Sequence, residues 1–203
     1  MATYVLVPGA WLGGWAWYDV AETLRDEGHE VYPVTLTGLG ERVHLGRPEV
    51  DLETHITDIV NTILANDLDD VILVGHSYGG IPVTGAADRV TERLQRVVFV
   101  DSAPLESGMA FLDLYPPEAR DGMQETVDRY GEGWKFPFPG WEAAGESASL
   151  DGISDEDLLW IEARGHVITP VVDKDMHNRT LCVWQERGDT VVLVAHQTTV
   201  LPL

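Results

Sequence analysis

The sequence predicts an α/β fold with a mostly parallel sheet flanked by helices. Short apolar runs alternate with amphipathic helical patterns through the first hundred residues. The segments between the runs are long enough for the helical crossovers that parallel strands require. The apolar run at 71–74 also ends abruptly in Gly-x-Ser-x-Gly, a pattern typical of a strand that turns sharply into a helix.

The strands follow from four short apolar runs, which lie at 4–7, 31–36, 71–74 and 96–100. A run of this length, bounded by glycine or polar residues, is typical of a buried strand. Because ligand sites in parallel sheets form beyond the carboxyl ends of the strands, we expect a site just after 71–74.

The helices follow from apolar residues at helical spacing, which predict segments over 17–24 and 52–63. Gly28 is a plausible C-cap for the first of these helices. A third helix is expected over 78–88. Pro82 is tolerated only in the first turn of that helix, so the helix must begin at the serine turn itself.

The pattern changes over residues 103–165, where five prolines stand among isolated aromatic residues. Short helices are expected there at 111–114, 117–130 and 154–164. We predict one domain over 1–203, with 103–165 as a small helical cap inserted over the strand ends. The aromatic residues favour a cap that shields an apolar pocket, because ligand sites are usually lined in this way. The alternatives are a linker or a peripheral satellite core.

The composition indicates an ordinary globular domain and disfavours several kinds of partner. The 203 residues are 44% hydrophobic and 23% charged, as in an ordinary globular domain. A formal net charge of −21 disfavours nucleic acid and anionic membrane as partners, since both would repel the chain. The single cysteine, Cys182, excludes an internal disulfide and a cysteine-based metal cage.

The chain shows no signal peptide and no apolar run near the roughly 20 residues of a membrane helix, so a cytoplasmic location is expected. The oligomeric state stays open, with a dimer through exposed cap aromatics as one alternative.

Ser77 is the central candidate residue. A serine on a sharp strand-to-helix turn exposes its hydroxyl, and the helix N-terminus behind it supplies free N–H groups and a positive dipole end that suit an oxyanion. A serine that only caps the helix is the alternative. The preceding apolar run favours a nucleophile.

Three stretches carry a resemblance to a known family: Val-Leu-Val-Pro-Gly-Ala-Trp at 5–11, Gly-Gly-Trp-Ala-Trp at 13–17 and Gly-His-Ser-Tyr-Gly-Gly at 75–80. They resemble the α/β-hydrolase superfamily, in particular small cofactor-free enzymes similar to plant methyl-ester esterases and hydroxynitrile lyases. The resemblance implies an oxyanion hole built from the backbone N–H groups of Ala10 and Tyr78. It implies no metal and no organic cofactor. Pro8 stands where the family often has histidine, which does not remove the Ala10 N–H.

A catalytic serine needs a base, and the base needs an orienting carboxylate. His76 lies inside the turn and is expected to point away from the Ser77 proton. Surface or packing roles are expected for His29, His44 and His55. By resemblance, the strand-plus-acid segment at 180–189 and the final strand at 190–196 give the triad Ser77, Asp189 and His196.

Spacing within the C-terminal segment conflicts with that triad. Only 185–189 separates the two strand-like runs, which is a hairpin length, whereas parallel strands need a crossover of about a dozen residues. Three alternatives stay open. Asp189 and His196 reach Ser77 by an irregular path; the base is His166 or His177 and the acid is Asp101; or the short C-terminal segment is a truncated remnant that leaves the site incomplete.

The leading functional hypothesis is a serine hydrolase that cleaves a small, largely apolar ester through an acyl-enzyme on Ser77. The second is a non-catalytic or degenerate α/β-hydrolase-like binding protein, motivated by the short C-terminal segment. The third is a hydroxynitrile lyase-like enzyme, which would need an extra cationic group in the pocket. Lys135 is the only lysine in the predicted cap.

Overall fold

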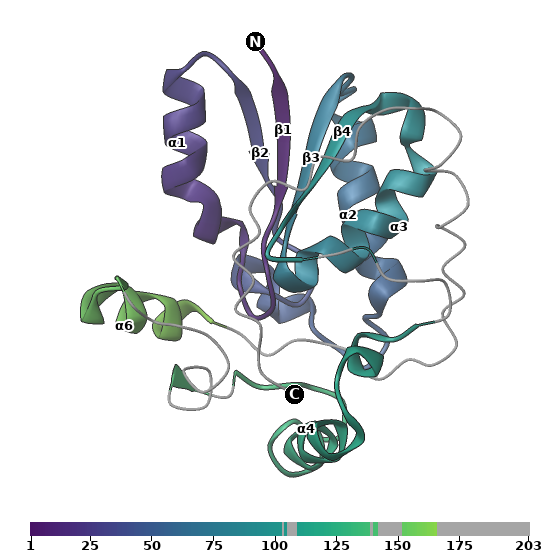
Figure 1. Ribbon diagram of the computed structural model, residues 1–203, viewed down its shortest axis with the longest axis vertical. Helices are drawn as coiled ribbons and strands as arrows, with labels where there is room; N and C mark the ends of the chain where they lie inside the picture. The colour runs from purple at the N-terminus through teal and green to yellow at the C-terminus, as the bar shows by residue number, and fades with distance from the viewer. Residues whose placement is uncertain (103, 105–108, 139, 142–151, 166–203) are drawn as a thin grey trace.

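The computed structural model describes residues 1–102, 104, 109–138, 140–141 and 152–165. A four-stranded sheet forms its centre, in the order β2-β1-β3-β4 (Figure 1). Its strands are β1 (Thr3–Val7), β2 (Glu30–Pro33), β3 (Val71–His76) and β4 (Leu94–Val100). Every pairing is parallel. The predicted α/β class and parallel sheet are confirmed.

The order of the strands places a topological switch between β1 and β3. From β1 the chain moves outward to β2, then crosses back to β3 on the other side of β1 and continues outward to β4. The two central strands are in register to their ends, where Val7 lies opposite Gly75. The loops that leave β1 and β3 therefore start side by side, and this is where ligands bind in open α/β sheets.

The helices cover both faces of the sheet (Figure 1). Helix α1 (Tyr18–Asp26) lies on one face, and α2 (Leu52–Ala65) and α3 (Gly80–Arg89) lie on the other. Short 3-10 segments occupy Gly14–Trp17, Gly40–Leu45, Ser77–Gly79 and Thr91–Arg93.

Side chains along each strand point alternately to the two faces of the sheet, which divides the core in two. Val5 and Val7 point into the larger core beneath α2 and α3, whereas Leu6 points into the smaller core beneath α1. In α2 the buried isoleucines stand at helical spacing, at Ile56, Ile59 and Ile63. These apolar faces explain why alternating strand and helix patterns in the sequence give a layered α/β domain.

Local signals set the element boundaries. Asp51 caps α2 by accepting the Thr54 N–H at 2.8 Å. Gly28 follows α1 with a φ of +86°, a left-handed conformation suited to a helix end. Pro82 lies in the first turn of α3, as predicted.

The second strand is shorter than the predicted run at 31–36. Its pairing with β1 ends at Pro33, where the following Val34 N–H donates to the Leu6 carbonyl oxygen at 2.9 Å. Residues 34–36 remain buried, but they leave the strand to form the start of the following loop.

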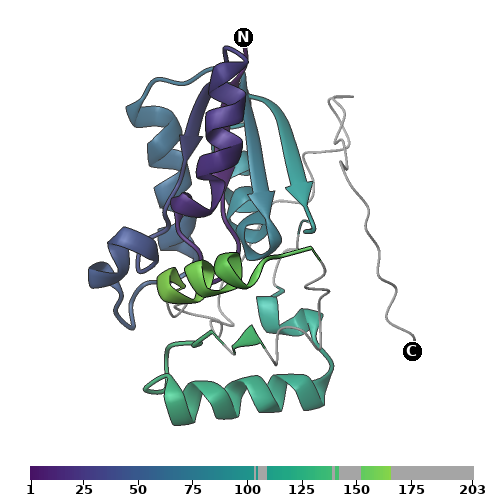
Figure 2. The same ribbon diagram turned by 90° about the vertical axis from the view of Figure 1, so that its left-hand side faces the viewer.

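Beyond β4 the described chain forms a 3-10 segment (Phe111–Leu114), α4 (Pro117–Tyr130) and α6 (Asp155–Arg164). The predicted helices at 111–114 and 117–130 agree with these bounds, and the third begins after Ser154, its N-cap. Figures 1 and 2 both show α4 and α6 past the carboxyl ends of the strands.

Contacts of Trp11 and Trp15 join the segment beyond β4 to the first loop. The Trp11 indole N–H donates to the Phe136 carbonyl at 3.0 Å, and Trp15 packs edge-on against Trp160. None of the described helices is long and apolar enough to cross a membrane.

Candidate active site

Ser77 stands at the turn between β3 and α3, at the switch point of the sheet. Its φ is +48°, in the left-handed region that side chains other than glycine rarely adopt. A 3-10 turn (Ser77–Gly79) follows, and α3 continues from Gly80. The serine is half-buried. A strained, sharp turn that keeps a hydroxyl partly accessible is the geometry that Gly-x-Ser-x-Gly predicts.

The flanking glycines are required by close backbone approach. A Cβ on Gly75 would lie 2.8 Å from the Cα of Gly80, so the strand and the helix could not pack as they do. A Cβ on Gly79 would lie 2.5 Å from the Pro8 carbonyl oxygen. Main-chain atoms cannot rotate away as a side chain can, so the glycines at 75 and 79 fix how tightly the turn packs.

The loop after β1 passes directly beside the serine. A Cβ on Gly9 would lie 3.2 Å from the Cβ of Ser77 and 2.8 Å from Nδ1 of His76. Gly9 therefore allows the loop to approach, and Ala10, the next residue, is buried there. The structure thus brings together Ser77 and the loop of the predicted oxyanion donor.

Two main-chain amides at this point are free of helix or ladder bonds. The hydrogen bonds of the described residues include none from the Ala10 N–H. Tyr78 lies in the first turn of the helical segment, where N–H groups have no intrahelical acceptor. Their role as oxyanion donors remains a prediction that this geometry favours.

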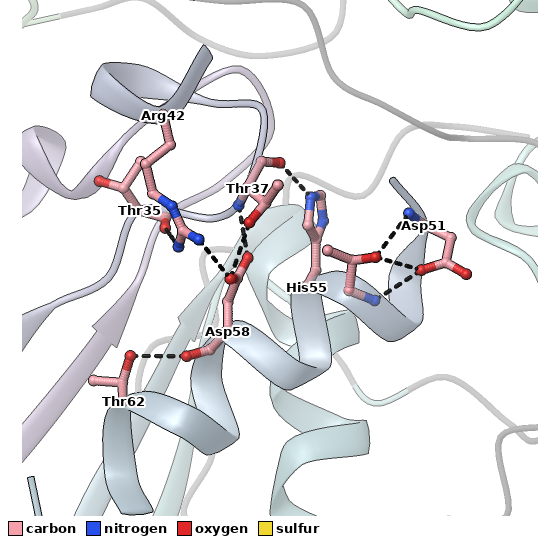
Figure 3. Close-up of polar contacts among 8 residues, drawn as sticks. Thr35, Thr37, Arg42, Asp51, His55, Asp58 and Thr62 are labelled. Carbon is pink, nitrogen blue, oxygen red and sulfur yellow. Dashed lines mark hydrogen bonds and ion pairs between the residues drawn. The ribbon is translucent and has the colours of Figure 1, made fainter. Parts of the chain in front are cut away.

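A buried polar network lies behind the turn, and the sequence reasoning missed it. His55 of α2 has no exposed surface, and its two ring nitrogens lie 2.8 Å from the Tyr78 hydroxyl and 2.9 Å from the Thr37 carbonyl oxygen. Thr37 donates its N–H and hydroxyl to Asp58, one turn further along α2 (Figure 3). The available signal was His55 and Asp58 three residues apart beside the isoleucines of an otherwise apolar helix face.

The network fixes the tautomer of His55. A carbonyl oxygen only accepts, so Nε2 carries the hydrogen and donates to Thr37, and Nδ1 accepts from the Tyr78 hydroxyl. Desolvation lowers the pKa of His55 below 6.5, against an opposing effect of the Thr37 bond. Burial also raises the pKa of the Tyr78 hydroxyl, which therefore keeps its proton. The pair is neutral and each member has a defined hydrogen-bond role.

The same network extends to the first loop. Arg42 pairs with Asp58 at 3.0 Å and donates to the Thr35 carbonyl at 2.9 Å (Figure 3). The Thr35 hydroxyl in turn accepts the Gly14 N–H at 2.8 Å. The loops after β1 and β2 and the turn after β3 are thus tied to α2 by one connected set of polar contacts.

His76 and Asp101 lie next to the turn. The His76 ring packs edge-on against Trp17, and desolvation lowers its pKa, partly offset by the Asp101 carboxylate. Asp101 follows β4, is exposed and has a φ of +44°. Ser102, beside it, donates to the Ser77 carbonyl at 2.6 Å. Asp101 thus stays an alternative acid, near the turn but without a hydrogen bond to any described histidine.

The remaining predicted base and acid residues, Asp189, His196, His166 and His177, lie outside the described residues. Lys135, the cation considered for a lyase, forms an ion pair with Glu132 at 2.6 Å and lies over the Trp134 ring. Within the described part of the chain, no group of three or more His, Cys, Asp or Glu side chains could hold a metal ion.

Comparison with known sequences finds relatives that are named as esterases. The sequence model of the Alpha/beta hydrolase family matches residues 4–202. The chain is 50% identical over 116 residues to a carbendazim hydrolyzing esterase from Nocardioides sp. (strain SG-4G), covering 57% of this chain and 48% of that protein. It is 39% identical over 107 residues to methylesterase 9 of Arabidopsis thaliana, covering 50% and 40%. The chain thus spans about half the length of these curated relatives.

Solved structures share the fold. An extracellular alpha/beta-hydrolase from a Paenibacillus species, described as sharing structural and functional homology with tobacco Salicylic Acid Binding Protein 2, superposes with a TM-score of 0.77 at 25% identity, covering 89% of this chain and 72% of that one. Polyneuridine aldehyde esterase superposes with a TM-score of 0.61 at 19% identity, covering 83% and 70%, and supports the fold alone.

Proposed function

Since the chain belongs to the alpha/beta hydrolase family, we propose that it is a serine hydrolase that cleaves small esters through an acyl-enzyme on Ser77. One observation carries the proposal. Ser77 is held at a φ of +48° at the carboxyl end of β3, in contact range of the glycine-containing loop after β1. Such strain persists where the surrounding structure enforces it, which is common at catalytic sites.

In the proposed reaction the Ser77 hydroxyl attacks the ester carbonyl while a general base takes its proton. The N–H groups of Ala10 and Tyr78 receive the oxyanion, which needs no metal. Collapse of the tetrahedral intermediate expels the alcohol, and water then hydrolyses the acyl-enzyme. We assign the base to His196 and the orienting acid to Asp189, with Asp101 as the alternative acid. The family match extends over all three positions.

The proposed substrates are small esters with a largely apolar acyl group. The relatives named for methyl-ester cleavage and for carbendazim hydrolysis support simple methyl esters and carbendazim as first compounds to test. Aromatic side chains of the proposed cap, 103–165, lie against the first loop and the serine turn: Phe136 and Phe138 contact Trp11, and Phe111 contacts Tyr78. These contacts support an apolar, sheltered pocket.

The test is steady-state hydrolysis of a panel of methyl esters and carbendazim by the wild type and by Ser77→Ala. We expect the variant to lose at least about a thousandfold in kcat. Thr57→Ala, which removes an exposed hydroxyl from α2, is the matched control and should keep full activity. Retained hydrolysis in Ser77→Ala would contradict the assignment. Ester binding without turnover by the wild type would instead favour the binding-protein alternative, and release of cyanide from a hydroxynitrile would favour the lyase.

A further inference from the structure

We propose that His55 is a positioning residue of this site. It holds the hydroxyl of Tyr78 and thereby fixes the main-chain N–H that Tyr78 offers to the oxyanion. The inference rests on the proposed function, and it adds a residue that neither the sequence motif nor the predicted triad includes. His55 touches no reacting atom; it acts only through Tyr78.

The first step of the argument is the position of Tyr78. It directly follows Ser77, whose left-handed backbone sets the direction of the Tyr78 amide. The Tyr78 side chain is 4% exposed, and its ring packs edge-on against both His55 and Phe111. A buried ring with few rotatable bonds, anchored at its far end, restrains the Cα from which it extends. Anchoring the hydroxyl therefore restrains the peptide next to Ser77.

The second step is the rigidity of the anchor. The Nε2–H of His55 donates to the Thr37 carbonyl, so the ring has one orientation and Nδ1 faces the Tyr78 hydroxyl. The Thr37 N–H and hydroxyl both donate to Asp58, at 2.6 and 3.0 Å. All three polar groups of Thr37 are thus used, and His55 is held by a residue that cannot itself rotate freely (Figure 3).

The third step is the link to the other amide donor. Asp58 pairs with Arg42, which donates to the Thr35 carbonyl, and the Thr35 hydroxyl accepts the N–H of Gly14. Gly14 lies on the same loop as Ala10, four residues further along. The network therefore holds both loops that carry the predicted oxyanion donors against α2. Preorganised donors of this kind act without reorganising during the reaction.

The test uses two variants that each keep one half of the imidazole. Asn in place of His55 sets its amide oxygen near the position of Nδ1, where it can still accept from Tyr78, and loses the bond to Thr37. Gln sets its amide nitrogen near the position of Nε2, where it can still donate to Thr37, and loses the bond to Tyr78. Both variants lose one buried hydrogen bond, but only His55→Gln releases Tyr78.

The readouts are the rate constant for labelling by a fluorophosphonate probe, kcat and KM for a methyl ester, and the free energy of unfolding. We expect His55→Gln to slow labelling and kcat by about 10- to 100-fold, with KM changed far less, because a small misplacement of an oxyanion donor acts on the transition state. His55→Asn should stay within about threefold of the wild type. Thr84→Val, which removes a buried hydrogen bond to the Gly80 carbonyl, should lower stability without changing kcat.

Tyr78→Phe provides the second arm and keeps the proposal testable if a His55 variant does not fold. It removes the hydroxyl but keeps the ring and the amide, and we expect it to match His55→Gln. In the Tyr78→Phe background, His55→Gln should produce no further loss, because its effect passes through the hydroxyl.

Equal effects of Asn and Gln that follow stability alone would overturn the inference, and so would additive effects of His55→Gln and Tyr78→Phe on the labelling rate. A wild type that the probe does not label at Ser77 would overturn the proposed function itself and, with it, the premise. Normal labelling of the wild type together with normal labelling of His55→Gln would overturn only the positioning role.

Discussion

Lowering the pH from 7.5 to 5.5 should destabilise the fold through His55. The ring is fully buried, and desolvation lowers its pKa below the value of 6.5 found in an unfolded chain. Below pH 6.5 the unfolded state therefore binds a proton that the native state does not. The stability that this difference contributes is complete above pH 6.5 and is lost as the pH falls from there toward the folded-state pKa.

The size of this loss in the free energy of unfolding follows from the protonation of His55 in the folded and unfolded states. Each pH unit over which the unfolded state binds one proton more than the folded state lowers the free energy of unfolding by about 1.4 kcal/mol. For a ring that stays neutral in the fold across this range, the step from pH 7.5 to 5.5 costs at most about 1.4 kcal/mol, because half of the range lies above the unfolded pKa. A competing effect has the opposite sign. The net charge of −21 falls in magnitude as the pH drops, which relieves repulsion in the native state.

Comparing the wild type with a His55 variant removes the competing effect of net charge. Urea unfolding of the wild type and of His55→Asn is measured at both pH values, and the charge effect is common to the two proteins. We expect the free energy of unfolding of the wild type to fall by up to about 1.4 kcal/mol more than that of the variant. Parallel pH dependences, or a wild type that gains relative to the variant, would refute the buried neutral imidazole on which the network depends.

Three substitutions test other parts of the structure. Gly79→Ala should cost about 1–3 kcal/mol in urea unfolding and slow labelling of the turn, because its Cβ would lie 2.5 Å from the Pro8 carbonyl oxygen. Asp51→Ala should cost about 1 kcal/mol, since it removes the N-cap of α2. Trp11→Phe should cost about 1 kcal/mol, because it leaves the Phe136 carbonyl without the indole donor.

Each of these three predictions has an outcome that would contradict it. Asp51→Asn keeps an N-cap acceptor and should recover most of the loss, so equal effects of Ala and Asn would exclude the cap as the cause. An unchanged urea midpoint in Gly79→Ala would show that the two loops are not in contact as described. For Trp11→Phe, a change in stability no larger than that of an exposed aromatic substitution such as Tyr130→Phe would contradict the bond to Phe136.

Much of the fold could be predicted from the sequence because each element carries a local signal. Short apolar runs predicted the four strands, helical spacing predicted α1 and α2, and the serine turn with Pro82 predicted the start of α3. The end of β2 could not be read in this way. The apolar run continues to Leu36, whereas the pairing of β2 with β1 ends at Pro33, so residues 34–36 are buried without belonging to the strand.

The candidate site also contains residues that a local signal predicts and residues that only tertiary packing brings together. Ser77 and its glycines follow from a short motif whose geometry is local, so sequence alone was enough to place them. His55 was assigned only a surface or packing role, because its partners Tyr78 and Thr37 stand 23 and 18 residues away in the chain. Its hydrogen bonds exist only once α2 packs against the serine turn. The base and acid depend in the same way on tertiary packing, which the hairpin-length spacing before Thr190 does not determine.

The measurement that tests the central claim most directly is the intact mass of the protein after exposure to a fluorophosphonate probe, followed by peptide mapping. The proposed function predicts a single adduct on Ser77 that Ser77→Ala does not form. Such an adduct would show that a base reaches the hydroxyl, and His196→Ala would then identify that base. A folded protein that stays unmodified, or one that is modified at another residue, would contradict the nucleophile assignment.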